Sequence, residues 1–405
     1  MASSWSWDTL VDAALAILAS RRTLLHTRLI ELAPTEVSAG MFAGPGPWHR
    51  ATVEIQLDRA SLNHWLTIMS LREDELSGMK LILFSGNDYM CLSSHPAVRE
   101  AAVKAAQAYG MGPRGSSLIC GYTTYHKLVE ESLAKLQKKE DCLLCPSGFS
   151  ANTAVMTALG SLSSLSAAGR KPAEEERIAI FSDALNHAST INGIHLVERT
   201  QAAVAYVYKH RDMSHLELLL SSCSMEKKVV VTDSLFSMDG DFAPLPELVK
   251  LRNKYGFLLV VDDAHGTFVC GENGGGVPEL FACENGIDIV VGSLSKGPGC
   301  LGGFIACSTR WKSTAIDVSK KETWRRSLIW GHVRYFASLT KLDVTSPIIL
   351  IVVGSEEVVL KAASHLLRSG FLVEPIRPPV VPPRSCITPW LPVKQVEKSL
   401  ATTSK

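Results

Sequence analysis

Six short runs of apolar, often β-branched residues alternate with helix-like segments in the middle of the chain, and this alternation limits the possible folds. The runs lie at 178–181, 203–207, 229–232, 257–261, 287–291 and 304–306. Segments with helical spacing of apolar residues, such as 216–220 and 245–255, lie between them. Continuously apolar strands joined through helices are typical of a mostly parallel sheet with helices on both faces. We therefore expect an α/β fold.

Polar clusters follow three of these runs directly. They contain Ser237 after residues 229–232, Asp262, Asp263 and His265 after residues 257–261, and Ser293 and Lys296 after residues 287–291. In parallel sheets, ligands collect beyond the carboxyl ends of the strands. The clusters therefore predict a binding site at that edge of the sheet.

A lysine and a carboxylate at neighbouring strand ends are what a pyridine-aldehyde cofactor, pyridoxal 5′-phosphate (PLP), requires. Lysine forms the imine, and the carboxylate holds a proton on the ring nitrogen. A lysine desolvated in a site has a lowered pKa and is a better nucleophile. Taken alone, Lys296 is more simply an exposed loop lysine. Asp262 and Asp263 leave a strand on opposite faces, so only one can face the site and the other would cap a turn or helix.

Weaker candidates lie on other segments. Gly148 and Phe149 begin a predicted helix, whose first N–H groups suit a phosphate. His187, after another strand, could stack on a pyridine ring or be a hydrogen-bonded loop histidine. His265 and Ser237 are candidates for hydrogen bonds to the phenolic oxygen of the cofactor.

The overall composition indicates a small-molecule substrate. The formal net charge is +1, from 41 Lys+Arg and 40 Asp+Glu, so no strong field would recruit nucleic acid or an anionic membrane. No segment reaches the ~18–20 uncharged apolar residues that cross a bilayer. Ten scattered cysteines suit a reducing compartment, with Cys142 and Cys145 as structural thiols, and no metal site is expected. We expect the cytosol, with the peroxisome as an alternative because Ser404 and Lys405 resemble an incomplete Ser-Lys-Leu signal.

Five motifs together are very specific. They are Pro-Ser-Gly-Phe-Ser-Ala-Asn at 146–152, Asn-His-Ala-Ser at 186–189, Phe-Ser-Met-Asp-Gly-Asp-Phe-Ala-Pro-Leu at 236–245, Val-Asp-Asp-Ala-His-Gly-Thr at 261–267 and Gly-Ser-Leu-Ser-Lys at 292–296. In their order along the chain and in their residues, these motifs resemble those of the α-oxoamine synthases, which are fold-type I PLP-dependent transferases. The chain is most similar to the branch of that family that serves biotin synthesis, in its plant forms. The similarity covers roughly residues 1–311 and, more loosely, 330–386.

The resemblance implies a role for each matching residue. Lys296 would be the Schiff-base lysine and main proton carrier, Asp262 the pyridinium partner, His187 the stacking residue, Gly148, Phe149 and Ser293 the phosphate contacts, Ser237 and His265 the 3′-oxygen contacts, and Asn87 a substrate-side residue. The implied reaction is a decarboxylative condensation of L-alanine with pimeloyl-CoA by a homodimer. The implied fold has a smaller C-terminal α/β domain beside the large sheet.

Two departures from the family pattern lie towards the C-terminus. After residue 312 the family continues with a Phe-Ser-Thr stretch that reaches the phosphate across the dimer interface, and residues 313–318 lack it. Val380 replaces a usual threonine, and no arginine follows Arg384, although the family pairs an arginine there with the substrate carboxylate. Seven prolines among residues 375–392 also argue against a central strand. Losing a carboxylate clamp should weaken substrate alignment more than PLP attachment.

These patterns predict three parts of the chain. Residues 1–96 would form an N-terminal helix, at 10–32, with a substrate-side segment, residues 97–311 the large PLP-binding domain, and residues 312–405 a truncated small domain. Three functional hypotheses remain. The chain is an active synthase, or an impaired isoform that binds PLP or dimerises without turnover, or a synthase that uses glycine or serine with another acyl-CoA.

Overall fold

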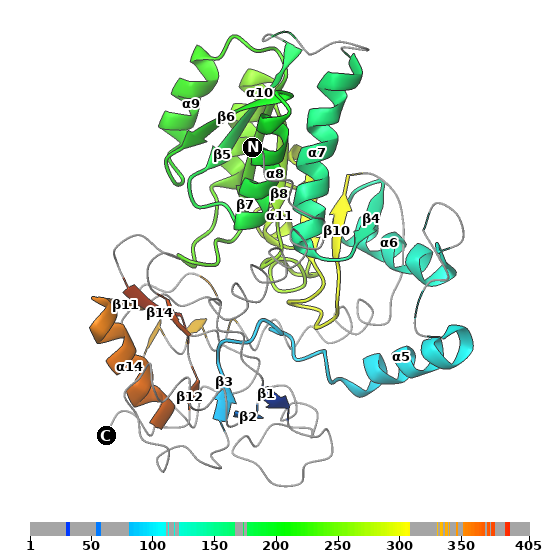
Figure 1. Cartoon of the computed structure of the whole chain (residues 1–405), viewed down its shortest axis with the longest axis vertical. Helices are drawn as coiled ribbons and strands as arrows, with labels where there is room; N and C mark the ends of the chain where they lie inside the picture. Colours follow the sequence, from blue (N-terminus) through cyan, green and yellow to red (C-terminus); the bar gives the residue numbers. More distant parts are fainter. Residues whose placement is uncertain are drawn as a thin grey trace, which may run out of the picture.

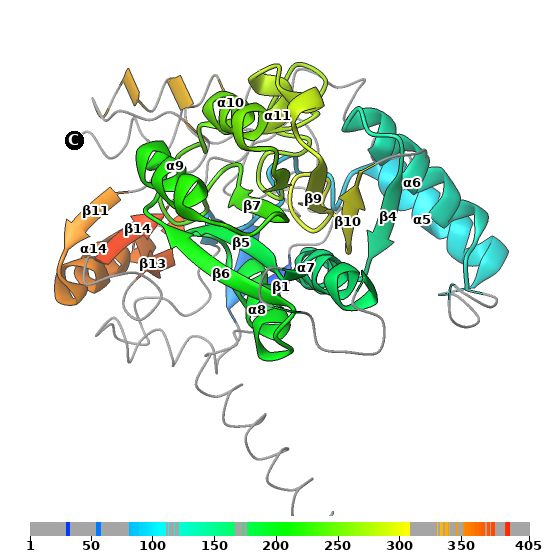
Figure 2. The ribbon, with the colours of Figure 1, turned by 90° about the horizontal axis from the view of Figure 1, so that it is seen from above.

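A computed structural model gives the fold, which Figures 1 and 2 show from two directions. The residues that the structure describes are 30–32, 54–57, 81–110, 112, 117, 121–166, 173, 176–307, 330, 333–334, 337–338, 340, 346, 351–368, 371–372, 374–376 and 385–388. Residues 313–318, which include the first departure from the family pattern, lie outside the described part.

A seven-stranded sheet forms the centre of the molecule, in the order β4-β10-β9-β8-β7-β5-β6. Its strands are β4 (Cys142–Cys145), β5 (Ile178–Asp183), β6 (Ala203–Tyr208), β7 (Lys228–Asp233), β8 (Leu258–Asp262), β9 (Ile289–Ser293) and β10 (Gly303–Ala306). Strands β6, β5, β7, β8 and β9 pair in parallel, and β10 is antiparallel to both neighbours. The predicted mostly parallel α/β sheet is therefore confirmed, and all six apolar runs contribute strands.

Helices cover both faces of this sheet (Figure 2). On one face lie α7 (Gly148–Ser166) and α8 (Ala188–Arg199), and on the other α6 (Thr124–Leu136), α9 (Met213–Ser222) and α10 (Leu245–Tyr255). All six residues of β5 are buried, as expected for a strand with both faces covered. The apolar core therefore fixes the strands rigidly and leaves their carboxyl ends available for polar residues.

Three further elements complete this part of the chain. They are the long helix α5 (Pro96–Tyr109), the short helix α11 (Val277–Leu280) and the 3-10 helix η2 (Glu284–Gly286). Helix α5 begins at a proline, with the His95 ring accepting a hydrogen bond from the Ala97 N–H group. Within the described residues, no helix combines the length and apolar composition needed to cross a membrane.

A second sheet joins segments from both ends of the chain, in the order β1-β2-β3-β12 (Figure 1). Its strands are β1 (Ile30–Leu32), β2 (Glu54–Leu57), β3 (Leu81–Leu83) and β12 (Phe371–Leu372). The predicted helix at 10–32 is wrong for its last three residues, because β1 pairs with β2 and this long-range pairing overrides the local helical pattern. The rest of that predicted helix lies outside the described residues.

A third, three-stranded antiparallel sheet belongs to the C-terminal part. It contains β11 (Ile351–Gly354), β14 (Ser385–Thr388) and β13 (Glu374–Ile376), next to helix α14 (Glu356–Arg368). The expectation that this proline-rich segment has no central strand is wrong, because β14 lies between β11 and β13. The sequence of β14 itself contains no proline, and Pro375 lies in the edge strand β13, where a missing N–H group is tolerated.

Candidate active site

Lys296 lies on the turn after β9 and points toward the turn after β8. Its Nζ atom is 2.7 Å from Nε2 of His265. The two turns pack tightly, because a Cβ atom added at Gly297 would lie 2.8 Å from the Thr267 carbonyl oxygen. Burial lowers the pKa of the Lys296 ammonium, and the charges of Asp262 and Asp233 oppose this effect. The amine is therefore a better nucleophile than an exposed lysine.

Asp262 ends β8 and is held by two donors. Its Oδ2 accepts a hydrogen bond from Asn152 Nδ2 at 2.6 Å, and its Oδ1 accepts one from the Ala264 N–H group at 3.0 Å. The side chain is only 7% exposed. Its charge acts on Lys296, as does that of Asp233 at the end of β7, so of the two neighbouring aspartates Asp262 is the one on the lysine side of the sheet.

Asp263 lies on the opposite side of the strand, as alternation requires. Its oxygens accept hydrogen bonds from Ser234 Oγ at 2.6 Å, Thr267 Oγ1 at 2.7 Å and the Val277 N–H group at 3.1 Å. Burial raises the pKa of Asp263 to about 7, although these donors act in the other direction. Asp263 therefore holds neighbouring loops together behind the site. This is a structural role, of the kind expected for whichever aspartate does not face the site.

His187 is fixed as the N-cap residue of α8. Its Nδ1 accepts a hydrogen bond from the Ser189 N–H group at 3.2 Å and lies 2.7 Å from Ser189 Oγ. Asn152 Nδ2 donates to the same Ser189 Oγ at 2.9 Å as well as to Asp262. One hydrogen-bonded chain therefore connects His187 to the carboxylate at the end of β8.

The start of α7 lies against the end of β9. A Cβ atom added at Gly148 would lie 3.2 Å from the Cβ of Ser293, so these two predicted phosphate contacts are neighbours. Ser147 Oγ accepts a hydrogen bond from the Ser150 N–H group at 3.1 Å. The first N–H groups of a helix have no partner within the helix, so those of Gly148 and Phe149 suit an anion. The Phe149 side chain itself is exposed, and its backbone is the relevant part.

Two predicted residues lie on loops at the edge of the site. The Asn87 side chain is exposed, and its backbone carbonyl accepts a hydrogen bond from the Tyr89 N–H group at 2.9 Å. Tyr89 in turn contacts His265. Ser237 is half-buried in the loop after β7, where Leu235 and Phe242 form an isolated bridge. Within the described residues no hydrogen bond joins Ser237 to His265 or Lys296.

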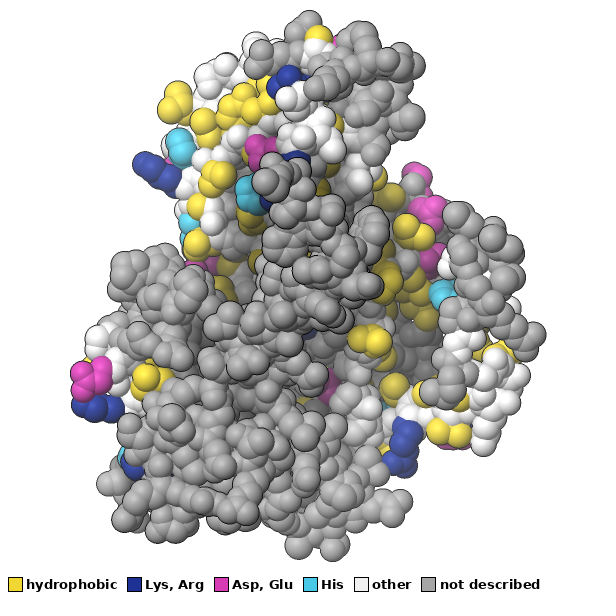
Figure 3. Space-filling view, in the orientation of Figure 1, with side chains coloured by type: hydrophobic (Ala, Val, Ile, Leu, Met, Phe, Trp, Pro, Cys, Tyr) yellow, Lys and Arg dark blue, Asp and Glu magenta, His cyan; other side chains and the backbone are white. Residues whose placement is uncertain are grey.

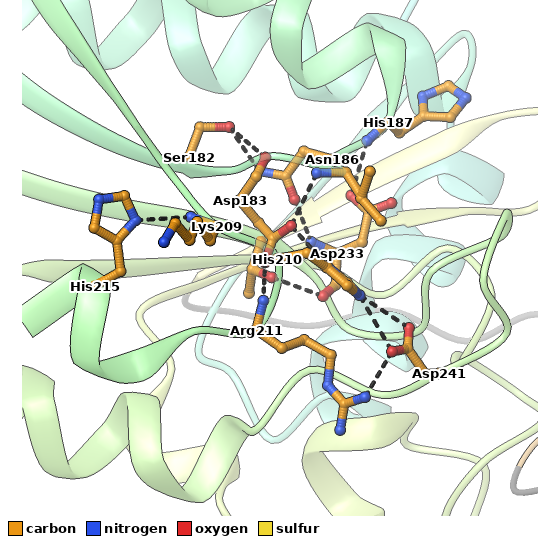
Figure 4. Close-up of polar contacts among 12 residues, drawn as sticks. Ser182, Asp183, Asn186, His187, Lys209, His210, Arg211, His215, Asp233 and Asp241 are labelled. Carbon is orange, nitrogen blue, oxygen red and sulfur yellow. Dashed lines mark hydrogen bonds and ion pairs between the residues drawn. The ribbon is translucent and has the colours of Figure 1, made fainter. Parts of the chain in front are cut away.

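A charged cluster at the ends of β5 and β6 holds the loops that carry His187 and Ser237 (Figure 4). The His210 ring lies 2.9 Å from Asp183 Oδ1 and 3.1 Å from Asp241 Oδ2, and Arg211 donates to Asp241 at 2.6 Å. Burial lowers the pKa of His210, but the hydrogen bonds and charges of both aspartates raise it to about 9. His210 is therefore a cation at neutral pH.

The sequence did not single out Asn152, Ser189 or Tyr89. Asn152 lies one helical turn after Gly148, on a helix whose neighbouring inward positions Ala151 and Val155 are apolar. A buried amide on such a face is a signal that could have identified it. The signal for Tyr89 is weaker, because its contact with His265 spans 176 residues of sequence.

The residues present fit PLP. A lysine of lowered pKa stands near a buried carboxylate, and a glycine at a helix start lies against a serine hydroxyl. The buried Oδ1 of Asn152 has no hydrogen-bond partner among the described residues, so polar capacity remains at the site. In the described part of the chain, no cluster of three or more His, Cys, Asp or Glu side chains could hold a metal ion.

Comparisons with known proteins identify the family of the chain. Residues 79–327 match the family model of class I and II aminotransferases. The chain belongs to this family, whose structural relatives are PLP-dependent transferases.

Individual relatives define its branch. The chain is 52% identical to the 8-amino-7-oxononanoate synthase of Arabidopsis thaliana, over 94% of this chain and 90% of that one. It is 36% identical to the enzyme of the same name from Citrifermentans bemidjiense, over 77% and 84% of the two chains. The resemblance to the biotin branch of the α-oxoamine synthases is thereby confirmed.

Solved structures share the fold. The serine palmitoyltransferase of Sphingomonas wittichii superposes with a TM-score of 0.72 at 25% identity, over 96% of this chain and 94% of that chain. The 8-amino-7-oxononanoate synthase of Francisella tularensis gives a TM-score of 0.61 at 23% identity, over 80% and 97%. The predicted fold-type I PLP-dependent transferase architecture is confirmed.

Proposed function

We propose that this chain catalyses the decarboxylative condensation of L-alanine with pimeloyl-CoA, which gives 8-amino-7-oxononanoate, CoA and CO2. The observation that carries the proposal is the arrangement of Lys296, His265 and Asp262 at the ends of two adjacent parallel strands. The curated relatives with the highest similarity support the choice of substrates, because they are named for this product.

PLP, when bound, supplies a ring that accepts electrons from the amino acid carbon. Lys296 would hold the cofactor through its amine and would carry a proton at Nζ, for which a lowered pKa is suited. Asp262, oriented by Asn152 and the Ala264 N–H group, keeps a proton on the ring nitrogen. His187 stacks on the ring, and the start of α7 with Ser293 binds the phosphate.

The C-terminal departures favour a second candidate function, an isoform that binds PLP without turnover. No arginine follows Arg384, whereas the family pairs an arginine in this region with the substrate carboxylate. Loss of a bidentate clamp weakens the alignment of the amino acid but leaves the strand-end cluster intact.

A spectral titration of the purified chain with PLP, followed by L-alanine and then pimeloyl-CoA, separates these functions. We expect a visible absorption band on adding PLP and release of CO2 after the acyl-CoA. A band without CO2 would support the isoform without turnover. CO2 released only with glycine or serine, or with another acyl-CoA, would change the substrates and keep the reaction class.

Two further proposals concern the setting of the enzyme. We propose a homodimer, supported by apolar side chains at the surface of β4, α7 and the turn before β10, where Leu143 is 58%, Phe149 49% and Leu301 87% exposed. Figure 3 shows apolar side chains at the surface of the described part. Light scattering tests the dimer. We also propose a cytosolic location, because the eight cysteines whose side chains the structure describes are free thiols, and a fluorescent fusion would test it.

A further inference from the structure

We propose that Tyr89 is a positioning residue that sets the tautomer of His265, so that the Nε2–H group of His265 points toward Lys296. The inference rests on the proposed function, since it concerns the residue expected to contact the 3′-oxygen of the cofactor. It assigns a role to a side chain outside the motifs that predicted the site.

The contact between Tyr89 and His265 is short and buried. The Tyr89 hydroxyl lies 2.6 Å from Nδ1 of His265, and the two side chains are 5% and 7% exposed. A second acceptor for this hydroxyl, Oδ1 of Asn87, is farther away at 3.5 Å. On the other side of the imidazole, Nε2 lies 2.7 Å from Lys296 Nζ. Both ring nitrogens are therefore engaged, one by the tyrosine and one by the lysine.

The direction of the first hydrogen bond follows from the chemistry of the two groups. A phenol hydroxyl is a better donor than a neutral imidazole N–H group, and the unprotonated imidazole nitrogen is the better acceptor. Burial raises the pKa of Tyr89 well above its usual value, so the hydroxyl keeps its proton. Nδ1 of His265 therefore accepts, and in the neutral ring the proton is on Nε2.

The ring is neutral because its surroundings disfavour a second proton. Burial lowers the pKa of His265 well below its usual value, and the nearby Lys296 and His187 act in the same direction. The charged and titratable groups at this site also include Asp262 and Asp233, which act on Lys296. While Lys296 is an ammonium it can only donate to Nε2. Once the amine is unprotonated, a state that burial favours, a neutral ring with its proton on Nε2 donates to it.

The loop that carries Tyr89 is held firmly against the lysine turn. Asp88 accepts hydrogen bonds from the Leu92 N–H group at 3.0 Å and the Ser93 N–H group at 3.1 Å. A side chain at Gly299, three residues after Lys296, would collide with the Ser93 backbone nitrogen and the Asp88 carboxylate. Tyr89 therefore occupies a fixed place relative to Lys296, which a residue that sets a tautomer requires.

The first test uses the cofactor-free protein, at a pH high enough to leave the Lys296 amine unprotonated, and measures the tautomer itself. The ring nitrogens of His265 are observed by NMR in protein labelled with 15N-histidine, with the signal assigned by its loss in His265→Asn. We expect the Nε2–H tautomer in the wild type and a mixture of tautomers in Tyr89→Phe. Tyr255→Phe is the matched control, because it removes a half-buried hydroxyl that donates to Glu217 at 3.1 Å on the outer helices.

The second test uses the PLP-loaded protein and follows its visible absorption against pH. Without a fixed Nε2–H donor, the negative charge on the phenolic oxygen is less stabilised, so the midpoint of the titration should rise by roughly half to one pH unit in Tyr89→Phe. Tyr255→Phe should leave it unchanged. In a His265→Asn background, Tyr89→Phe should add no further shift if Tyr89 acts through His265.

The outcomes separate this inference from the proposed function. An Nδ1–H tautomer in the wild type, or a Tyr89→Phe variant with unchanged tautomer and midpoint, overturns the role of Tyr89. If the wild type forms no visible band with PLP, cofactor attachment fails, and the NMR measurement on the cofactor-free protein still decides the tautomer.

Discussion

The carboxyl edge of the seven-stranded sheet and the small C-terminal sheet are built in different ways. At the first, buried strands end in side chains that hydrogen-bond across several elements, as Asn152 and Asp262 do. The second consists of β11, β13 and β14, each three or four residues long, supported by α14. Predicted cofactor residues lie at the first edge, and β14 of the second sheet is the described part of the region where the sequence departs from the family pattern near its C-terminus. Cofactor attachment and substrate alignment therefore depend on separately stabilised parts of the chain.

The largest effect is expected from Lys296→Ala, which removes the only side chain proposed to attach the cofactor covalently. Activity should fall by roughly 1,000-fold or more, because the proton carrier is lost together with the imine. The measurement is visible absorbance after dialysis, with CO2 release as the second readout. A band that survives dialysis in this variant would show that another residue holds the cofactor.

Asp262→Asn should come next, with kcat/KM lowered by about 100-fold, because an amide cannot hold the ring-nitrogen proton by its charge. Asp263→Asn is the matched control. It should change activity by less than about tenfold and lower the unfolding free energy by about 1–2 kcal/mol, since Asp263 ties Ser234, Thr267 and Val277 together. Alanine α-proton exchange and urea unfolding measure the two effects. The reverse ranking would assign the ring contact to Asp263.

A matched pair of core substitutions sharpens the comparison between the regions. Val359 in α14 and Val260 in β8 are both fully buried, so each change to alanine should cost about 2 kcal/mol. Val359→Ala should speed hydrogen exchange in residues 356–368 without changing PLP absorbance. Val260→Ala should weaken PLP binding as well. Loss of PLP from Val359→Ala would mean that the two regions are not independent.

The smallest effect concerns the charged cluster around His210. Its pKa of about 9 lies above the ordinary value near 6.5, so its contribution to stability is full below pH 6.5 and is lost as the pH rises through 9. His210→Gln should therefore cost about 1 kcal/mol at pH 6 and much less at pH 9.5, allowing for the partial exposure of the ring.

Urea unfolding at the two pH values measures this difference. Asp241→Asn should show the same pH dependence, because it removes one partner of the cation. If the difference in unfolding free energy between wild type and variant is the same at both pH values, His210 does not act as a charged link between the loops.

The local sequence pattern was sufficient to predict the strands and the edge of the sheet where the site lies. Continuous apolar runs predict buried parallel strands, and such strands place their following residues at one edge, so Asp262 and Lys296 were expected there. Because neighbouring side chains leave a strand on opposite faces, only one of the two aspartates was expected to face the lysine. In the structure this aspartate is Asp262. The roles assigned through the family resemblance stay predictions for all the site residues: Asn87, Gly148, Phe149, His187, Ser237, Asp262, His265, Ser293 and Lys296.

The local sequence pattern could not predict contacts between segments that are far apart in the chain. Asn152 and Asp262 are 110 residues apart, and Tyr89 and His265 are 176 apart. Such pairs depend on strand order and loop packing, which no short motif encodes. The same reason explains β1, where pairing with β2 replaces the expected helical end, and β14, whose place between two strands is set by its partners.

The parallel pairing of β3 with β12 has a consequence for biosynthesis. Phe371 lies opposite Ile82, about 290 residues earlier in the chain. The seven-stranded sheet is complete at Ala306, so it can form while later residues are still on the ribosome. The sheet that contains β1, β2 and β3 receives its last strand only when synthesis is nearly finished. During translation, the exposed edge of β3 is therefore the part of the nascent enzyme that chaperones would have to protect.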